Sequence, residues 1–179
     1  MDMKTIVDEL DTASEKISDA SLENIIEKLR SHPRIFVYGT GRSGLMLKAF
    51  AMRLMQIGLN AYVVSETTTP SIAAGDLLVV ASASGTTASV CMTAESAKAQ
   101  GADLLVLTAD PEAQLAAIAA PDIVIPSATK FSTSAVSVQP LGSLFEQMLL
   151  VVFDAVILRM SRSASGSNDA MAKRHASLE

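Results

Sequence analysis

Residues 77–87, LLVVASASGTT, decide the fold of this chain and the location of its chemistry. The first five of them are apolar without interruption, which is typical of a strand buried on both faces of a parallel sheet. The other six contain four hydroxyl side chains and one glycine, and a helix-forming segment follows at residues 88–100. Because a helix N-terminus presents free N–H groups and the positive end of its dipole, this hydroxyl turn (residues 82–87) predicts an anion-binding site.

The composition of the hydroxyl turn favours a monophosphate as the anion. The turn contains no lysine, and its spacing does not fit the G-x-x-x-x-G-K-[ST] loop that binds a triphosphate with Mg²⁺. We therefore expect a sugar monophosphate, with the binding residues Ser82, Ala83, Ser84, Gly85, Thr86 and Thr87. An alternative stays open, because Ser and Thr also shape turns and cap helices.

The segments around this turn predict an α/β fold with a doubly wound, five-stranded parallel sheet. Short apolar runs that predict strands alternate with helical patterns, and this alternation is typical of such sheets. The strands are expected at 35–38, 61–64, 77–81, 104–107 and 123–125. The helices between them are expected at 43–57, 88–100 and 112–119. Two amphipathic helices are expected before the sheet, at 6–18 and 22–30, with Ser21 and Glu23 near a helix start. A polar stretch at 127–137 and a long helix at 141–159 are expected after it.

The length of 179 residues predicts one domain that spans residues 1–179. Within it, residues 1–31 form the N-terminal helical part and residues 161–179 the C-terminal tail. The segment 161–168 is rich in Ser and Gly and is predicted to be a flexible link.

The helices predicted at 43–57 and 141–159 are apolar nearly all round. A helix without a polar face must be buried on several sides, and one sheet cannot cover both of these helices. We therefore expect a homo-oligomer, with burial inside a single chain as the alternative.

A second glycine-rich loop, GTGRSG at residues 39–44, follows the first predicted strand. Together with Glu66, 27 residues after Gly39, it matches a dinucleotide fingerprint, so an NAD(P)-binding oxidoreductase is an alternative. However, the chain has no room for a separate substrate domain, and one pyrophosphate would not explain the hydroxyl turn as well. We expect Gly41 to allow close backbone approach and Ser43 to donate at a helix start.

The composition argues against several classes of partner. A net charge of −5, 4% aromatic residues and no Trp disfavour nucleic acid. The single cysteine, Cys91, cannot form an intramolecular disulfide, which favours the cytoplasm. We find no signal-peptide pattern, no run long enough to cross a membrane, and no His/Asp/Glu cluster with metal-ligand spacing.

The two loops together are similar to those of the sugar isomerase (SIS) domain family, and more narrowly to the 6-phospho-3-hexuloisomerases. The resemblance covers nearly the whole chain, at residues 38–44, 48–54, 66–70, 75–76, 82–87, 139–147 and 174–179. It implies a flavodoxin-like sheet, a homotetramer, and a reaction without metal or cofactor. In this family the hydroxyl turn often has the sequence SGSGET; here Ala83 replaces Gly and Thr86 replaces Glu, while Ser82, Ser84 and Thr87 are kept.

The resemblance also implies an activity in the ribulose monophosphate pathway of formaldehyde fixation. It is the isomerisation of D-arabino-hex-3-ulose 6-phosphate to fructose 6-phosphate through an enediol(ate). A base in the motif at 139–147 would transfer the proton, which selects Glu146. The alternative for Glu146 is a first-turn residue that only complements the helix dipole.

The resemblance assigns a second role to His175, as a histidine that reaches the substrate of a neighbouring subunit. His32 precedes Pro33 in a turn that we expect to be exposed. Arg42 and Arg174 are candidates to neutralise the phosphate or the enediolate, and surface salt bridges are the alternative for both.

Two further functions stay open besides the oxidoreductase. The chain could isomerise another phosphosugar, because residue types alone do not separate pentose, hexose and heptose phosphates. It could also be a sugar-phosphate-sensing domain, although residues 1–30 are too short and too acidic for a DNA-binding helix-turn-helix.

Overall fold

The computed structural model describes residues 1–129, 136–162 and 168–177. Its centre is a five-stranded sheet in the order β2-β1-β3-β4-β5, and every pairing is parallel. The strands are β1 (Ile35–Tyr38), β2 (Ala61–Val63), β3 (Leu77–Ser82), β4 (Asp103–Thr108) and β5 (Ile123–Val124). The predicted doubly wound α/β sheet is confirmed, and each strand lies within two residues of its predicted range.

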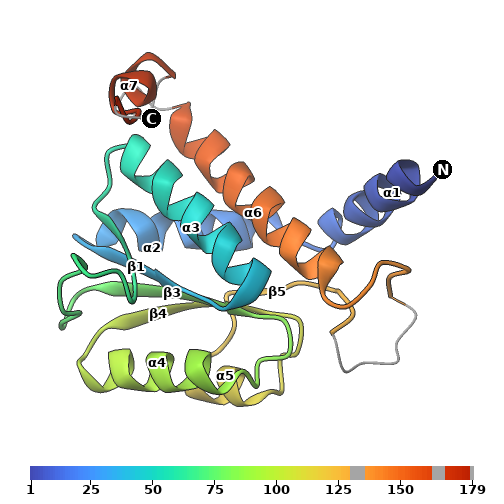
Figure 1. Cartoon of the computed structure of the whole chain (residues 1–179), viewed down its shortest axis with the longest axis horizontal. Coiled ribbons are helices and arrows are strands. Elements are labelled where there is room, and N and C mark those ends of the chain that lie inside the picture. Colours follow the sequence, from blue (N-terminus) through green and yellow to red (C-terminus); the bar gives the residue numbers. More distant parts are fainter. Residues whose placement is uncertain (130–135, 163–167, 178–179) are drawn as a thin grey trace.

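Helices cover both faces of the sheet (Figure 1). One face packs against α2 (Asp19–Ser31), α3 (Gly41–Gln56) and α6 (Ser143–Ser161), and α1 (Asp2–Ser14) lies against α6. The other face packs against α4 (Ala88–Ala99) and α5 (Gln114–Ile118). Alternate residues of β3 enter the two cores: Leu77, Val79 and Ala81 on the α3 side, Leu78 and Val80 on the α4 side.

The two N-terminal helices do not begin and end where the sequence pattern predicted. α1 ends at Ser14, four residues before the expected end. The reason is Ser18, which lies in extended backbone and accepts a hydrogen bond from the Ser21 N–H, so it is the N-cap of α2. The predicted helix start at Ser21 is therefore wrong by one turn.

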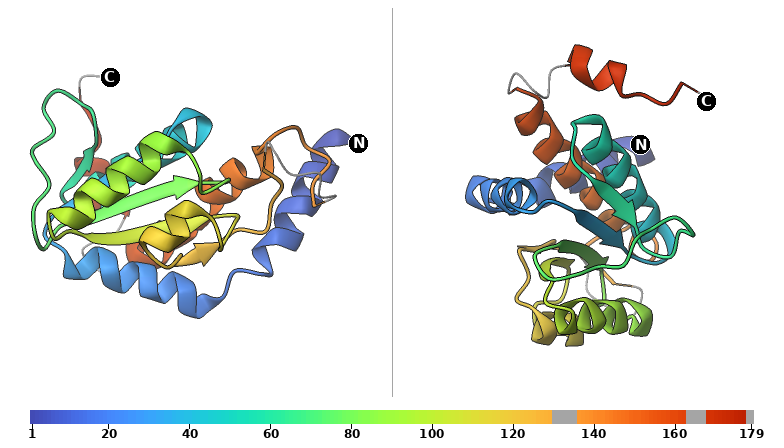
Figure 2. Two further views of the ribbon diagram at one scale, coloured as in Figure 1. Left: turned by 90° about the horizontal axis from the view of Figure 1, so that it is seen from below. Right: turned by 90° about the vertical axis from the view of Figure 1, so that its left-hand side faces the viewer.

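The chain ends with a short helix, α7 (Asn168–Lys173), that the sequence analysis did not anticipate. It lies beside the C-terminal end of α3, away from the sheet (Figures 1 and 2). Most of the predicted link at 161–168 and part of the polar stretch at 127–137 lie outside the described residues.

The two apolar helices, α3 and α6, are only partly buried within the chain. They pack against each other, with the rings of Phe50 and Phe153 stacked at 4.1 Å between centroids. Apolar side chains nevertheless remain exposed on both helices: Leu45, Met52, Met55, Leu150, Val151 and Leu158. In the described part of the chain, none of the helices has the length and apolar character needed to span a bilayer.

Candidate functional site

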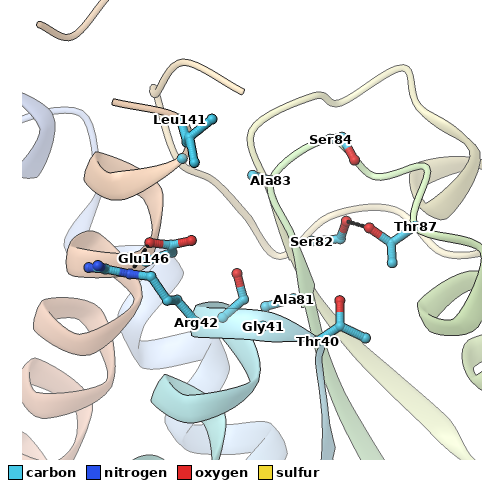
Figure 3. Close-up of a pocket in the computed structure, with 12 residues that line it drawn as sticks. Thr40, Gly41, Arg42, Ala81, Ser82, Ala83, Ser84, Thr87, Leu141 and Glu146 are labelled. Carbon is cyan, nitrogen blue, oxygen red and sulfur yellow. Dashed lines mark hydrogen bonds and ion pairs between the residues drawn. The ribbon is translucent and has the colours of Figure 1, made fainter. Parts of the chain in front are cut away.

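A pocket lies at the carboxyl ends of β1 and β3, where the sheet changes its winding direction. The chain leaves β1 into α3 on one face and leaves β3 into α4 on the other. Ligands of open α/β sheets bind at such a switch point. Figure 3 shows the pocket, which is lined by Thr40, Gly41, Arg42, Ser43, Ala81, Ser82, Ala83, Ser84, Thr87, Leu141, Gly142 and Glu146.

The hydroxyl turn forms one wall of this pocket. The Ser82 hydroxyl lies 3.1 Å from the Thr87 hydroxyl and accepts a hydrogen bond of 3.2 Å from the Gly85 N–H. Gly85 itself is buried behind the wall and has a φ of +61°. A Cβ at this position would lie 2.5 Å from the Ala113 Cβ, so both the conformation and the packing favour glycine.

In the described chain, Thr86 is not one of the residues that line the pocket. Thr86 is exposed, and its hydroxyl donates to the Ser84 hydroxyl at 3.1 Å. Of the predicted phosphate-binding residues, the structure brings Ser82, Ala83, Ser84 and Thr87 to the wall, and it leaves Gly85 and Thr86 as supports of the turn.

The N-termini of three helices meet at the pocket. Thr40, Thr87 and Gly142 are the N-cap residues of α3, α4 and α6, and all three line the pocket. Within the described ranges, none of these helices has a side-chain cap bond. The first-turn N–H groups therefore supply hydrogen-bond donors and positive potential for an anion.

The glycines of residues 39–44 bring α3 close to β1. A Cβ on Gly44 would lie 2.5 Å from the Gly39 carbonyl oxygen. Gly41 has a φ of +57° and lines the pocket next to Ser43. Glu66 contributes to two other surface hollows, and its place outside this pocket weakens the dinucleotide interpretation.

Glu146 lies in the first turn of α6, on the side of the pocket opposite Ser82 and Thr87 (Figure 3). Its Oε2 is 2.5 Å from Arg42 Nε. The Glu146 side chain is 18% exposed and that of Arg42 is 62% exposed, so the carboxylate is largely buried while the guanidinium faces solvent. This arrangement holds a carboxylate and a cation together beside the anion-binding turn.

Several pocket residues were missed by the sequence analysis. Thr40 lies inside the glycine-rich loop, Ala81 precedes the hydroxyl turn, and Leu141 and Gly142 precede α6. All four lie within or next to the motifs that carry the family resemblance, so their position beside these motifs could have identified them as pocket residues. Leu141 has a φ of +58°, a strained conformation for a side chain of this size, and nothing in the local sequence predicts it.

His175 lies outside the pocket of its own chain. It follows α7, which Arg174 attaches to the far end of α3 through a 3.1 Å hydrogen bond from Nη1 to the Gln56 carbonyl. α3 has 16 residues, so this end is about 24 Å from the pocket at its N-terminus. The predicted catalytic role of His175 and the candidate contact of Arg174 with phosphate therefore both require a second subunit, and both stay predictions.

The described residues do not contain a group of three or more His, Cys, Asp or Glu side chains placed to bind a metal ion. The polar groups around the pocket are hydroxyls, N–H groups and one guanidinium, which can donate hydrogen bonds, and one carboxylate, which accepts them. This set suits a phosphate ester and proton transfer.

The chain belongs to the SIS domain family, because the sequence pattern of that family matches residues 28–154. Two relatives named 3-hexulose-6-phosphate isomerase are similar over nearly the full length. The one from Bacillus subtilis is 40% identical, covering 97% of this chain and 95% of the relative. The one from Mycobacterium gastri is 41% identical, covering 99% and 89%.

A solved structure supports the same relationship. A Methanococcus jannaschii protein, whose crystal structure was taken to infer a 3-hexulose-6-phosphate isomerase function, matches with a TM-score of 0.83 and 28% identity. The match covers 99% of both chains. The predicted flavodoxin-like SIS fold is thus confirmed.

Proposed function

We propose that this protein isomerises D-arabino-hex-3-ulose 6-phosphate to fructose 6-phosphate in the cytoplasm, as a step of the ribulose monophosphate pathway. The names of the full-length relatives support the substrate. The observation on which the proposal depends most is the pocket itself. It combines an anion-binding turn on one wall with the carboxylate of Glu146 on the other.

In this proposal the phosphate binds at the hydroxyl turn. Ser82, Ser84 and Thr87 donate from their hydroxyls, and Ser43 with the first-turn N–H groups of α3 and α4 completes the site. The sugar then extends across the pocket toward Glu146. This orientation follows from the placement of the two groups on opposite walls.

Glu146 transfers the proton of the reaction. Its carboxylate removes the proton from C2, the electron pair forms the C2–C3 double bond, and the C3 carbonyl becomes the enediol(ate) oxygen. The same carboxyl group returns the proton to C3, while the O2 proton passes to O3. Arg42, at 2.5 Å from Glu146, stabilises the negative charge of the enediolate once its guanidinium turns toward the sugar.

His175 completes the site from a neighbouring subunit and moves the proton between O2 and O3. The exposed apolar residues of α3 and α6 support a homo-oligomer, and we propose a tetramer. Leu45 on α3 is 57% exposed and Leu158 on α6 is 56% exposed, which is costly for side chains left in water.

The test of the function is the formation of fructose 6-phosphate from the 3-hexulose 6-phosphate with no cofactor added. We expect turnover by the purified protein and loss of turnover in Glu146→Gln. Turnover only with a pentose or heptose phosphate would show that the substrate is a different sugar phosphate. A requirement for NAD(P) would refute the isomerase proposal.

The test of His175 is subunit mixing. A chain shortened to end before Lys173 is mixed with Glu146→Gln chains after partial unfolding and refolding. Regained turnover in the mixed oligomer would support catalysis between subunits. Full activity of the shortened chain alone would remove His175 from the reaction.

A further inference from the structure

Glu9, on the N-terminal helix α1, is joined to the loop that enters α6. This α6 loop comprises residues 136–142, of which Leu141 and Gly142 line the pocket. Glu9 Oε2 accepts hydrogen bonds of 2.7 Å from the Ser137 hydroxyl and 2.9 Å from Gln139 Nε2. Glu9 Oε1 accepts one of 2.7 Å from the Val138 N–H.

The same network continues into α6. Gln147 Nε2 donates to Gln139 Oε1 at 2.8 Å, so Gln139 links Glu9 to the residue directly after Glu146. Although partial burial opposes ionisation, the hydrogen bonds from Ser137, Gln139 and Val138 hold the pKa of Glu9 below its ordinary value. A charged carboxylate that accepts three hydrogen bonds holds its donors firmly in place, because hydrogen bonds to a charged group are stronger than those between neutral groups.

The α6 loop needs such hydrogen bonds to stay in one conformation, because it is not part of the sheet. It lies outside the strands, and Leu141 is held at a positive φ although it is 71% exposed. Figure 1 shows α1 against the start of α6, where this loop enters the helix. Hydrogen bonds that the loop donates to Glu9 of α1 therefore restrain the loop where packing does not.

We propose that Glu9 is a positioning residue, which fixes the α6 loop and thereby the carboxylate of Glu146 relative to the hydroxyl turn. The proposal rests on the proposed function of Glu146 in proton transfer. It assigns to α1 a role in catalysis although none of the residues lining the pocket comes from that helix in the described part of the chain.

The first experiment is steady-state kinetics of Glu9→Gln on the sugar phosphate. The amide keeps the shape but cannot accept all three hydrogen bonds. We expect kcat to fall about tenfold, because small displacements of a catalytic group have large effects. KM should stay within about twofold, because the phosphate is bound by a different loop. Asp11→Asn is the matched control, since it removes one exposed negative charge from the same helix.

The second experiment is a double-mutant cycle with Gln147→Leu. In the described chain, Gln139 connects Glu9 with Gln147 by donating to the former and accepting from the latter. If both act on Glu146 through this relay, Glu9→Gln adds little to the loss of kcat caused by Gln147→Leu. Additive losses, or a loss explained by the unfolded fraction in circular dichroism, would overturn the proposal.

The outcomes also separate this proposal from the proposed function. Turnover retained by Glu146→Gln would refute the function, whatever Glu9→Gln does. Turnover lost in Glu146→Gln but equal in Glu9→Gln and Asp11→Asn would refute only the positioning role.

Discussion

The two walls of the pocket are held in different ways. The hydroxyl turn continues β3, the central strand of the sheet, whose six residues are all buried. The start of α6 is preceded by a loop that one side chain of α1, Glu9, restrains across 128 to 130 residues of sequence. Sheet backbone thus fixes the wall proposed to bind phosphate, and side-chain hydrogen bonds fix the wall proposed to transfer the proton.

This difference suggests that one wall binds the substrate and the other carries out proton transfer, which mutations can test. If the walls have separate tasks, changes in the hydroxyl turn should affect KM, and changes at the start of α6 should affect kcat. A variant that changes both parameters equally would show that the walls act as one unit.

The largest expected effect on turnover comes from Glu146→Gln. The amide fits the same space but cannot take up a proton from C2, so we expect kcat to fall by about 10³-fold. Binding of the sugar phosphate, measured by calorimetry, should be retained because the hydroxyl turn is untouched. Loss of binding as well would contradict the separation of the two walls.

Ser82→Ala should give the next largest effect, and mainly on KM. The variant removes a hydroxyl that lines the pocket and accepts from the Gly85 N–H. Hydrogen bonds to a charged ligand contribute about 1.5–3 kcal/mol, so KM should rise by about 10- to 100-fold with little change in kcat.

Thr86→Val is the matched control for Ser82→Ala. Its hydroxyl belongs to the same turn and donates to the Ser84 hydroxyl, but in the described chain Thr86 itself does not line the pocket. Its KM should stay near that of the parent protein. An equal rise in both variants would show that the turn, and not the Ser82 hydroxyl, was disturbed.

Gly85→Ala tests how firmly the sheet holds its wall. The new Cβ would meet the Ala113 Cβ at 2.5 Å, and the φ of +61° adds strain. We expect the free energy of unfolding to fall by about 2–3 kcal/mol, measured by urea denaturation. Gly75→Ala is the control: its φ is +85°, but the described chain places no atom within 4 Å of the new Cβ, so strain alone should cost about 1 kcal/mol.

The contrast between the two walls also explains which parts of the structure could be predicted from the sequence. The apolar run before Ser82 was sufficient for β3 and the hydroxyl turn, because local pattern and backbone geometry determine both. The side of the pocket with Glu146 was reached only through a family resemblance. Neither the positive φ of Leu141 nor the partnership of Glu9 with residues 137–139 has a local signal.

Helix α7 was missed for a similar reason. It is six residues long and has no buried residue among those described. Arg174 attaches it to the end of α3, and the partly buried Met171 packs against the hydrophobic core. Long-range contacts of individual side chains are the part of this structure that sequence patterns do not contain.

Asp76 should have the smallest effect on turnover, since it lies at the opposite end of β3 from the pocket. Its carboxylate accepts from Arg34 Nε at 2.8 Å and Nη2 at 2.6 Å, and from the Ala73 N–H at 2.7 Å. Burial opposes ionisation, but these donors hold the pKa of Asp76 below its ordinary value of 3.8. Asp76→Asn should therefore leave kcat unchanged and lower the free energy of unfolding by about 2 kcal/mol at neutral pH.

The pH dependence gives this prediction its sign. Because the pKa of Asp76 is lower in the folded than in the unfolded protein, its stabilisation is complete above pH 3.8 and decreases as the pH falls through the folded-state pKa. The difference in unfolding free energy between the parent and Asp76→Asn should shrink over that range. Asp103→Asn is the control, since its carboxylate bonds His32 but is 72% exposed and should matter less. A change in kcat of Asp76→Asn at neutral pH would show that the two ends of the central strand are coupled, and that the sheet transmits strain to the phosphate-binding wall.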